Sequence, residues 1–182
     1  MYNGGKWPHR THKEEPQRME TSETRFSARP ARREDFPVIA AFPRNEEEQY
    51  YMYPRGTFPL DPEQLAREAG GRVRPTVVLD GEAVIGYCNM YGVVSGSHGW
   101  LGNVIIDPDS RGKGAGRFLV ETMAAIARDE LGLRELRLVC HNTNTAALRL
   151  YWRTGFKPYD LEGPKDDSGR MRILMKRVLA DA

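Results

Sequence analysis

Residues 103–116 read Asn-Val-Ile-Ile-Asp-Pro-Asp-Ser-Arg-Gly-Lys-Gly-Ala-Gly, and this stretch decides the fold. Its apolar run predicts a strand, and residues 117 to about 131 carry apolar side chains at helical spacing. Between them, three glycines within five residues let successive backbone N–H groups converge, and the positive end of the helix dipole attracts an anion. With Arg111 and Lys113 beside it, the loop is predicted to bind a pyrophosphate.

Two common phosphate loops do not fit this stretch. The P-loop of nucleotide triphosphatases needs Gly-Lys followed by Ser or Thr, but Lys113 is followed by Gly114. The dinucleotide fingerprint needs a glycine three residues after Gly114, where Arg117 stands. ATP and NAD are therefore poor fits.

Composition limits the class of protein. The chain has 182 residues, 40% hydrophobic and 29% charged, as expected of one soluble domain with a real core. A net charge of +2 argues against a nucleic-acid partner, and no apolar run approaches the ~20 residues that span a bilayer. Cys88 and Cys140 form no CxxC pair, which predicts reduced, buried thiols and a cytoplasmic location.

The pattern along the chain divides it into a tail and a domain. Residues 1–24 contain only four large apolar side chains, which predicts a flexible N-terminal tail, and residues 25–182 are predicted to form one α/β domain. The predicted element order is β-α-α-β-β-β-α-β-α-β-β, with a parallel pair of strands across the crossover from Val104 to Val139. Residues 33–42 are predicted to form a helix, residues 44–60 are predicted to be irregular, and Asp80-Gly81 is predicted to form a type I′ hairpin turn. Asp61 and Asn144 are predicted to cap the starts of two further helices, and Gly155 is predicted to end the second of them.

The arginine and two glycines of the loop match a longer pattern. Arg111, Gly114 and Gly116 give Arg-x-x-Gly-x-Gly, and residues 144–156 read Asn-Thr-Ala-Ala-Leu-Arg-Leu-Tyr-Trp-Arg-Thr-Gly-Phe. Together, over roughly 150 residues from Arg25 to Val178, they resemble the GNAT superfamily of acetyl-CoA-dependent N-acetyltransferases. The resemblance implies a GNAT-like fold, a central mixed twisted β-sheet with helices on both faces.

The resemblance also implies where acetyl-CoA binds. The loop amides are expected to hold the diphosphate, and the pantetheine arm is expected between Val104–Ile106 and a diverging strand, Leu136–Cys140. A free strand N–H there can polarise the acetyl carbonyl. The residues expected to bind the cofactor are Val104, Ile105, Ile106, Arg111, Gly112, Lys113, Gly114, Ala115, Gly116, Asn144 and Tyr151.

The reaction needs a general acid and a general base, and the sequence offers a clear candidate only for the acid. Tyr151 matches the tyrosine that protonates the leaving thiolate in this family, although a core aromatic is the alternative interpretation. The base is open, because Leu101–Val104 carries no carboxylate. The candidates are His141, whose side-chain type titrates near neutrality, the carboxylates of Glu46–Glu48, or a chain of water. No set of residues has metal-ligand spacing.

Residues 45–54 are expected to cover the acceptor. They combine three carboxylates with three tyrosines, which can attract and hold a cationic amine, so a lysine-like, peptidyl or polyamine acceptor is expected. The alternative is a solvated acidic turn. The chain looks like a bacterial GNAT subgroup that acetylates small amines or peptide lysines, as a monomer or homodimer. The alternative is a catalytically silent acyl-CoA-binding module. The residues expected to bind the acceptor are Glu47, Glu48, Tyr50, Tyr51 and Asn103.

Overall fold

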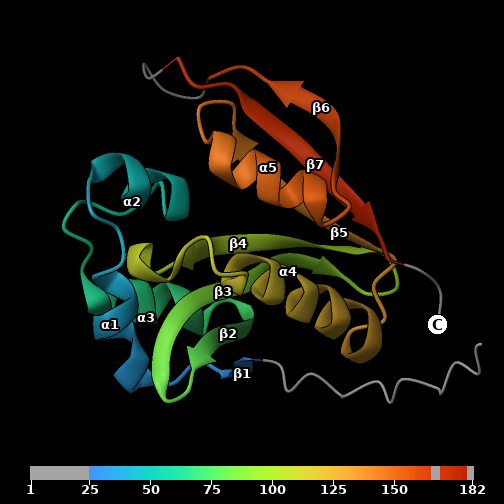
Figure 1. Ribbon diagram of the computed structural model, residues 1–182. Helices are drawn as coiled ribbons and strands as arrows, with labels where there is room; N and C mark the ends of the chain where they lie inside the picture. The colour runs from blue at the N-terminus through green and yellow to red at the C-terminus, as the bar shows by residue number, and fades with distance from the viewer. Residues whose placement is uncertain (1–24, 165–168, 180–182) are drawn as a thin grey trace, which may run out of the picture.

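The computed structural model describes residues 25–164 and 169–179, so the predicted tail, residues 1–24, lies outside the described residues. Seven strands form one sheet in the order β1-β2-β3-β4-β5-β7-β6 (Figure 1). Neighbours pair antiparallel except β4 and β5, which pair in parallel as the crossover predicted. The strands are β1 Phe26–Pro30, β2 Val73–Asp80, β3 Ala83–Val94, β4 His98–Ile106, β5 Glu135–His141, β6 Lys157–Glu162 and β7 Arg172–Val178.

Helices cover both faces of the sheet, as predicted. The α-helices are α1 Phe36–Ala40, α2 Glu46–Met52, α3 Pro62–Gly70, α4 Ala115–Ala125 and α5 Thr145–Arg153. Short helical turns precede α1 and α4, and a π-helical turn, Ile126–Glu130, extends α4. Within the described ranges, no helix is both long and apolar enough to cross a membrane.

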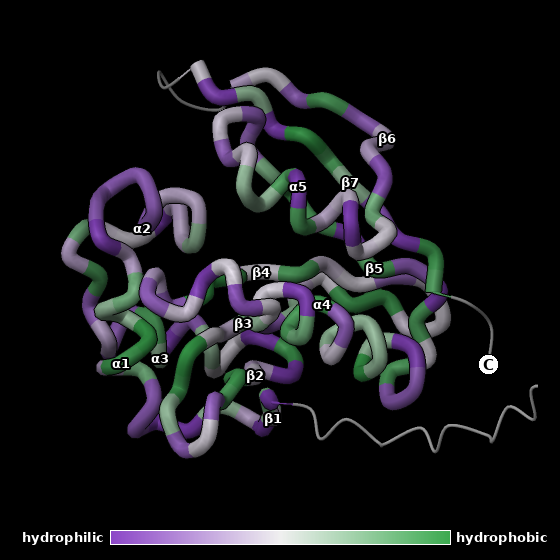
Figure 2. Tube along the Cα trace, viewed as in Figure 1, coloured by the Kyte–Doolittle hydropathy of each residue, from purple (hydrophilic) through white to green (hydrophobic). Residues whose placement is uncertain are grey.

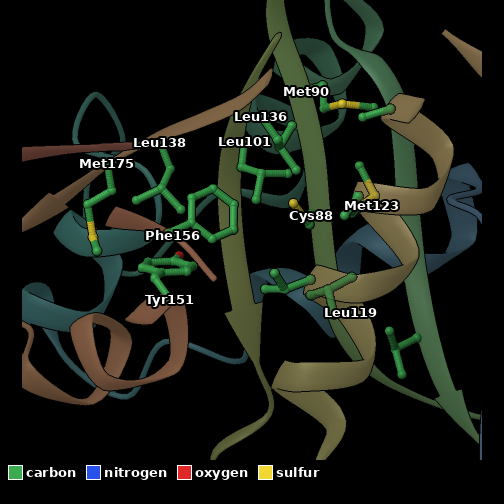
Figure 3. Close-up of a cluster of buried hydrophobic side chains, with 14 of the residues drawn as sticks. Cys88, Met90, Leu101, Leu119, Met123, Leu136, Leu138, Tyr151, Phe156 and Met175 are labelled. Atoms are coloured by element: carbon green, nitrogen blue, oxygen red, sulfur yellow. The ribbon is translucent and has the colours of Figure 1, made fainter. Parts of the chain in front are cut away.

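The core has two parts, one on each face of the sheet. Leu119 and Met123 of α4 and Tyr151 of α5 belong to the larger cluster, whereas Ile39 of α1 and Leu65 of α3 belong to the other. Figure 3 shows the larger cluster, with the side chains of β3 and β4 facing α4 and those of β5 and β7 grouped around Tyr151 and Phe156. The two cysteines are free and buried, as predicted.

Strand β4 changes face at Asn103. Leu101 packs into the α4 cluster, but Ile105 packs into the α1–α3 cluster, although residues four apart in a regular strand share a face. The register against β3 shifts between Asn89↔Gly102 and Tyr87↔Ile105, so β4 carries a β-bulge there. Asn103 has φ +53°, a left-handed conformation that asparagine adopts more readily than most residues.

The predicted helix ends at α3 and α5 are confirmed. The Asp61 carboxylate accepts from the Glu63 N–H before α3, and the Asn144 side-chain oxygen accepts from the Ala147 N–H before α5. Gly155 ends α5 with φ +89°. The two N-cap side chains accept hydrogen bonds from N–H groups that have no partner within the helix, and the glycine allows the chain to turn away at the end of α5. Each effect depends on neighbouring residues only, so the local sequence predicts these helix ends well.

Three local predictions were wrong. Residues 44–60 are not irregular throughout, because Glu46–Met52 forms α2 behind the N-cap Asn45, whose side chain accepts from the Glu48 N–H. The single helix predicted over residues 33–42 is a 3₁₀ turn followed by α1. The hairpin turn consists of Gly81 and Glu82, and only Gly81 has positive φ, which is the pattern of a type II′ turn.

Candidate active site

Strands β4 and β5 separate after a short paired stretch. Their parallel register covers His98–Trp100 against Glu135–Arg137 and ends there. Beyond this stretch the two strands do not pair with each other. A cavity of about 1190 Å³ lies there, and it is lined by Leu101–Ile106 of β4 and Leu138–His141 of β5. In Figure 1 the part of the sheet that carries β5, β7 and α5 diverges from the part that ends at β4. The divergence predicted from the sequence is therefore present.

The glycine loop forms one wall of this cavity. Gly112 and Gly114 have φ +77° and +97°, conformations that side chains rarely allow, and Gly114 is the N-cap of α4 without any side-chain cap. A Cβ on Gly116 would lie 3.2 Å from Leu150 Cδ2 of α5, so glycine keeps the two helices close. The uncapped amides of the first turn of α4 suit an anion, and this wall fits the diphosphate of CoA.

Arg111 is paired across the cavity wall. Its Nη1 and Nη2 donate to Glu48 Oε1 and Oε2 at 2.6 and 3.1 Å, and its Nε donates to the Ile106 carbonyl at 3.1 Å. The Arg111 guanidinium holds the pKa of the Glu48 carboxyl below its usual range. This ion pair joins α2, where the sequence predicts the acceptor, to the glycine loop, where the sequence predicts the diphosphate of CoA.

Tyr151 lies where the cavity meets the core. Its ring is 6% exposed and packs edge-on to Phe156 at 5.8 Å between ring centres, as Figure 3 shows. Burial raises its pKa well above the ordinary tyrosine value, and Cys140 and Cys88 add to the shift. The hydroxyl is therefore protonated throughout the physiological pH range and able to donate a proton.

His141 also lines the cavity, at the end of β5. It is 8% exposed, and its ring centre is 5.0 Å from that of Tyr50 and 5.9 Å from that of Tyr51. The Tyr51 hydroxyl also accepts a hydrogen bond from Thr143 Oγ1 at 2.7 Å, because its own proton is donated to Glu47. His141, at the end of β5, thus packs against two aromatic rings of α2.

The sequence was compared with models of known protein families. The sequence pattern of the acetyltransferase (GNAT) family matches residues 29–156. The chain belongs to the GNAT family. Its resemblance to that family, recognised from Arg111 to Gly116 and from Asn144 to Phe156, is confirmed, and this family takes acetyl-CoA as its acetyl donor.

Individual relatives of this GNAT chain are similar over different lengths. A mycothiol acetyltransferase of Geodermatophilus obscurus is 49% identical over 51 residues, which are 28% of this chain and only 16% of that protein. The spermidine N-acetyltransferase of Vibrio cholerae in complex with CoA and spermine has a TM-score of 0.71 at 20% identity, covering 85% of this chain and 96% of that one. The ribosomal-protein-S18-alanine N-acetyltransferase of Escherichia coli has a TM-score of 0.65 at 22% identity, covering 86% and 96%. These likenesses establish the shared GNAT fold.

The GNAT fold brings most of the predicted site residues to the one cavity. Those that line it are Glu47, Glu48, Tyr51, Asn103, Val104, Ile105, Ile106, Arg111, Gly112, Gly114, Gly116, His141, Asn144 and Tyr151. Both amide atoms of Asn103, however, are bonded within the protein, to Asn89 and to the Met52 carbonyl. In the part of the chain that the structure describes, no three His, Cys, Asp or Glu side chains gather as a metal site.

Four predicted residues do not reach this cavity: Lys113, Ala115, Tyr50 and Glu46. Lys113 is exposed, and its ammonium donates to the Asp109 carbonyl at 2.8 Å. The Ala115 side chain is buried in the core, so only its backbone faces the N-terminus of α4. Tyr50 lines a second pocket of about 750 Å³ on the other side of α2, together with Glu46 and Arg170.

Six arginines line the cavity that the sequence interpretation did not select. Arg117 lies in α4, and Arg149 and Arg153 lie in α5. The other three are Arg55 after α2, Arg72 before β2 and Arg172 at the start of β7. The spacing of four between Arg149 and Arg153, on one helix face next to the predicted cofactor asparagine, was a usable signal. The other group comes from three separate segments, so no local pattern joins it.

Proposed function

We propose that this GNAT chain is an N-acetyltransferase that moves an acetyl group from acetyl-CoA to a primary amine while both are bound. One observation carries the proposal. A single cavity runs from the glycine loop, between the diverging strands, to the face of α2. Both substrates therefore have a place within one continuous cavity, which direct transfer requires.

The residues around the loop fit the donor. Gly112, Gly114 and Gly116 shape a wall of backbone amides, and Arg117, Arg149 and Arg153 add positive charge beside it. The unpaired edges of β4 and β5 offer N–H and C=O groups to an extended arm that contains amides. When bound, acetyl-CoA supplies the activated acetyl thioester.

The chain's own residues must then move protons. The reaction joins the acceptor nitrogen to the acetyl carbon and breaks the carbon–sulfur bond, so one proton leaves nitrogen and one is returned to sulfur. We assign the return to the Tyr151 hydroxyl, because its buried, neutral form is a competent donor to a thiolate. We assign the removal to His141, which lines the same cavity beside the rings of α2.

The carboxylates of α2 are weaker candidates for the base. Glu48 is held ionised by Arg111. Glu47 accepts from the Tyr51 hydroxyl at 2.8 Å and lies 3.7 Å from Arg170. Glu48 gains little by taking a proton, because its pairing with Arg111 stabilises the charged form.

The same pairs bear on the acceptor. The hypothesis of a cationic, lysine-like or polyamine acceptor depended on the charges of Glu47 and Glu48, and both are engaged by arginines. Arg55, Arg72 and Arg172 also line the cavity. We therefore propose a primary amine as the acceptor, and the charge of the rest of the acceptor molecule is to be measured.

A panel of amines tests the proposal. Purified protein with acetyl-CoA should release free thiol only when an acceptor is added, and mass spectrometry should find the acetylated amine. The panel should pair each amino acid with its amide and should include a polyamine and a lysine peptide, so that charge is varied at constant amine type. Tight CoA binding without thiol release from any amine would instead indicate the silent binding module.

One finding bears on where the protein works. Cys88 and Cys140 are free thiols in the core, which supports the prediction of a reducing compartment such as the cytoplasm.

A further inference from the structure

Helix α2 has little apolar surface with which to hold its position. It is seven residues long and reads Glu-Glu-Glu-Gln-Tyr-Tyr-Met, and Figure 2 shows it as a largely hydrophilic segment. Of its residues, only Gln49 and Met52 are buried. A helix this short is marginal in water, so contacts with the rest of the protein must fix it.

The polar contacts of α2 are mostly exposed. Glu48 pairs with Arg111, Tyr51 bonds to Thr143, and Glu47 lies near Arg170, all at partly or fully exposed side chains. Exposed ion pairs and hydrogen bonds contribute little to a fixed position, because water and ions compete for them. None of these three contacts explains how α2 keeps its place.

One buried contact differs from these. Asn103 Nδ2 donates to the Met52 carbonyl at 3.1 Å, across 51 positions of sequence. The Met52 carbonyl is one of the orphan acceptors at the C-terminal end of α2. Asn103 is 7% exposed and Met52 is 3% exposed, so the bond is shielded from water.

A second asparagine fixes the amide of Asn103. Asn89 Nδ2 donates to Asn103 Oδ1 at 2.8 Å and to the Tyr87 hydroxyl at 3.0 Å. This leaves Asn89 Oδ1 as a buried oxygen without a hydrogen-bond partner in the described residues. An unpaired buried oxygen lowers stability, so stability alone does not account for this arrangement.

We propose that Asn103 is a positioning residue that ties the end of α2 to the bulge of β4, and so holds the acceptor side of the cavity against the strand that faces the acetyl group. Asn103 is itself the bulge residue with positive φ. One residue thereby sets the direction of the β4 backbone and the place of α2. The inference rests on the proposed function for its meaning in catalysis, but the tie itself can be tested without activity.

Asn103→Gly separates the side chain from the backbone. Glycine adopts positive φ freely, so the bulge is retained while both amide contacts are lost. Hydrogen–deuterium exchange should become about tenfold faster in α2 and stay unchanged in α4 and α5. In kinetics, kcat/KM for the amine should fall about tenfold, whereas the Kd of CoA should change less than about twofold.

Asn103→Asp tests the donor at constant volume. An ionised carboxylate repels the Met52 carbonyl, so α2 should exchange as fast as in Asn103→Gly at high pH. A protonated carboxyl can donate to that carbonyl, so protection relative to wild type should return as pH is lowered. Thr143→Val is the matched control, since it removes an exposed contact of α2, and it should change exchange in α2 less than about twofold.

The outcomes are separable. Wild-type exchange in α2 of Asn103→Gly would overturn the proposal, and so would equal losses of CoA affinity and amine kcat/KM, which would mean a general structural role. If the wild-type protein transfers no acetyl group, the proposed function fails, while the exchange data still decide whether Asn103 holds α2.

Discussion

Glu48 and Arg111 form a two-pronged ion pair, at 2.6 and 3.1 Å, between residues 63 positions apart in the sequence. Glu48 belongs to α2, and Arg111 precedes the glycine loop at the start of α4. The pair therefore connects the wall proposed for the acceptor with the wall proposed for the diphosphate. Any anion that binds Arg111 must share it with Glu48.

Glu48→Gln should tighten the binding of CoA. The substitution removes a negative charge beside the diphosphate wall and frees the guanidinium of Arg111. We expect the Kd of CoA in calorimetry to fall about threefold to tenfold, which corresponds to roughly 1 kcal/mol. Glu47→Gln is the matched control, because Glu47 does not contact Arg111, and it should leave the Kd unchanged. Weaker binding by Glu48→Gln would contradict this competition.

Tyr151→Phe should slow the reaction without loosening the protein. The variant keeps the ring that packs on Phe156 and removes only the hydroxyl. We expect kcat to fall about 10²-fold or more, with the Kd of CoA and the melting temperature nearly unchanged. Because burial raises the pKa of Tyr151 well above its ordinary value, wild-type activity should not decline between pH 8 and 10 from loss of this proton. Full activity in the phenylalanine variant would remove Tyr151 from the mechanism.

His141→Gln should alter the acid side of the pH–rate profile. If His141 takes the proton, kcat/KM falls at low pH along a limb whose position does not change with the pKa of the amine. We expect the variant to lose that limb and about 10²-fold in rate. Acceptors with different amine pKa values separate this limb from protonation of the amine itself. A limb that follows the amine and persists in the variant would exclude His141 as the base.

Gly114→Ala should weaken CoA binding by more than its strain predicts. Gly114 has φ +97° at the start of α4, and Gly132, which does not line the cavity, has φ +60°. Alanine at either position costs about 1 kcal/mol of stability. Only Gly114→Ala should also raise the Kd of CoA, by about tenfold, since it disturbs the amides at the diphosphate wall. Equal binding by the two variants would argue against this placement.

Asp35→Asn should destabilise the fold most clearly near neutral pH. The Asp35 carboxylate is 4% exposed and accepts from both arms of Arg29, at 2.7 and 2.8 Å, and from the Arg32 N–H. The Arg29 guanidinium lowers the pKa of Asp35, so this stabilisation is present above the ordinary aspartate pKa and is lost as pH falls through the lower folded value.

Urea unfolding measures this difference. We expect a loss of about 2 to 4 kcal/mol for Asp35→Asn at pH 7, and a smaller gap between variant and wild type as the solution is acidified below pH 4. Asp80→Asn is the control, because the Arg25–Asp80 pair is exposed and its removal should leave the midpoint unchanged. A constant gap from pH 7 to pH 2 would mean that the carboxylate charge is not what stabilises this corner.

The parts that local sequence predicted are those where one short segment decides its own conformation. The glycines at 112 and 114 require positive φ, Asn144 and Asp61 cap the helices that follow them, and the crossover between β4 and β5 has one favoured geometry. Helix α2 was missed although Asn45 and three glutamates in its first turn are a recognisable start signal, because its tyrosines show no clear apolar face.

The sequence by itself determined the family, the fold and the positions of the loop glycines, because glycine conformations, caps and periodicity depend on neighbouring residues only. The tertiary structure decided which charges meet and which polar atoms are buried. It paired Glu48 with Arg111, separated Tyr50 from the main cavity, and used Asn103 to hold the Met52 carbonyl. Such contacts join residues dozens of positions apart, and each side chain has several possible partners until the sheet brings one within hydrogen-bond distance.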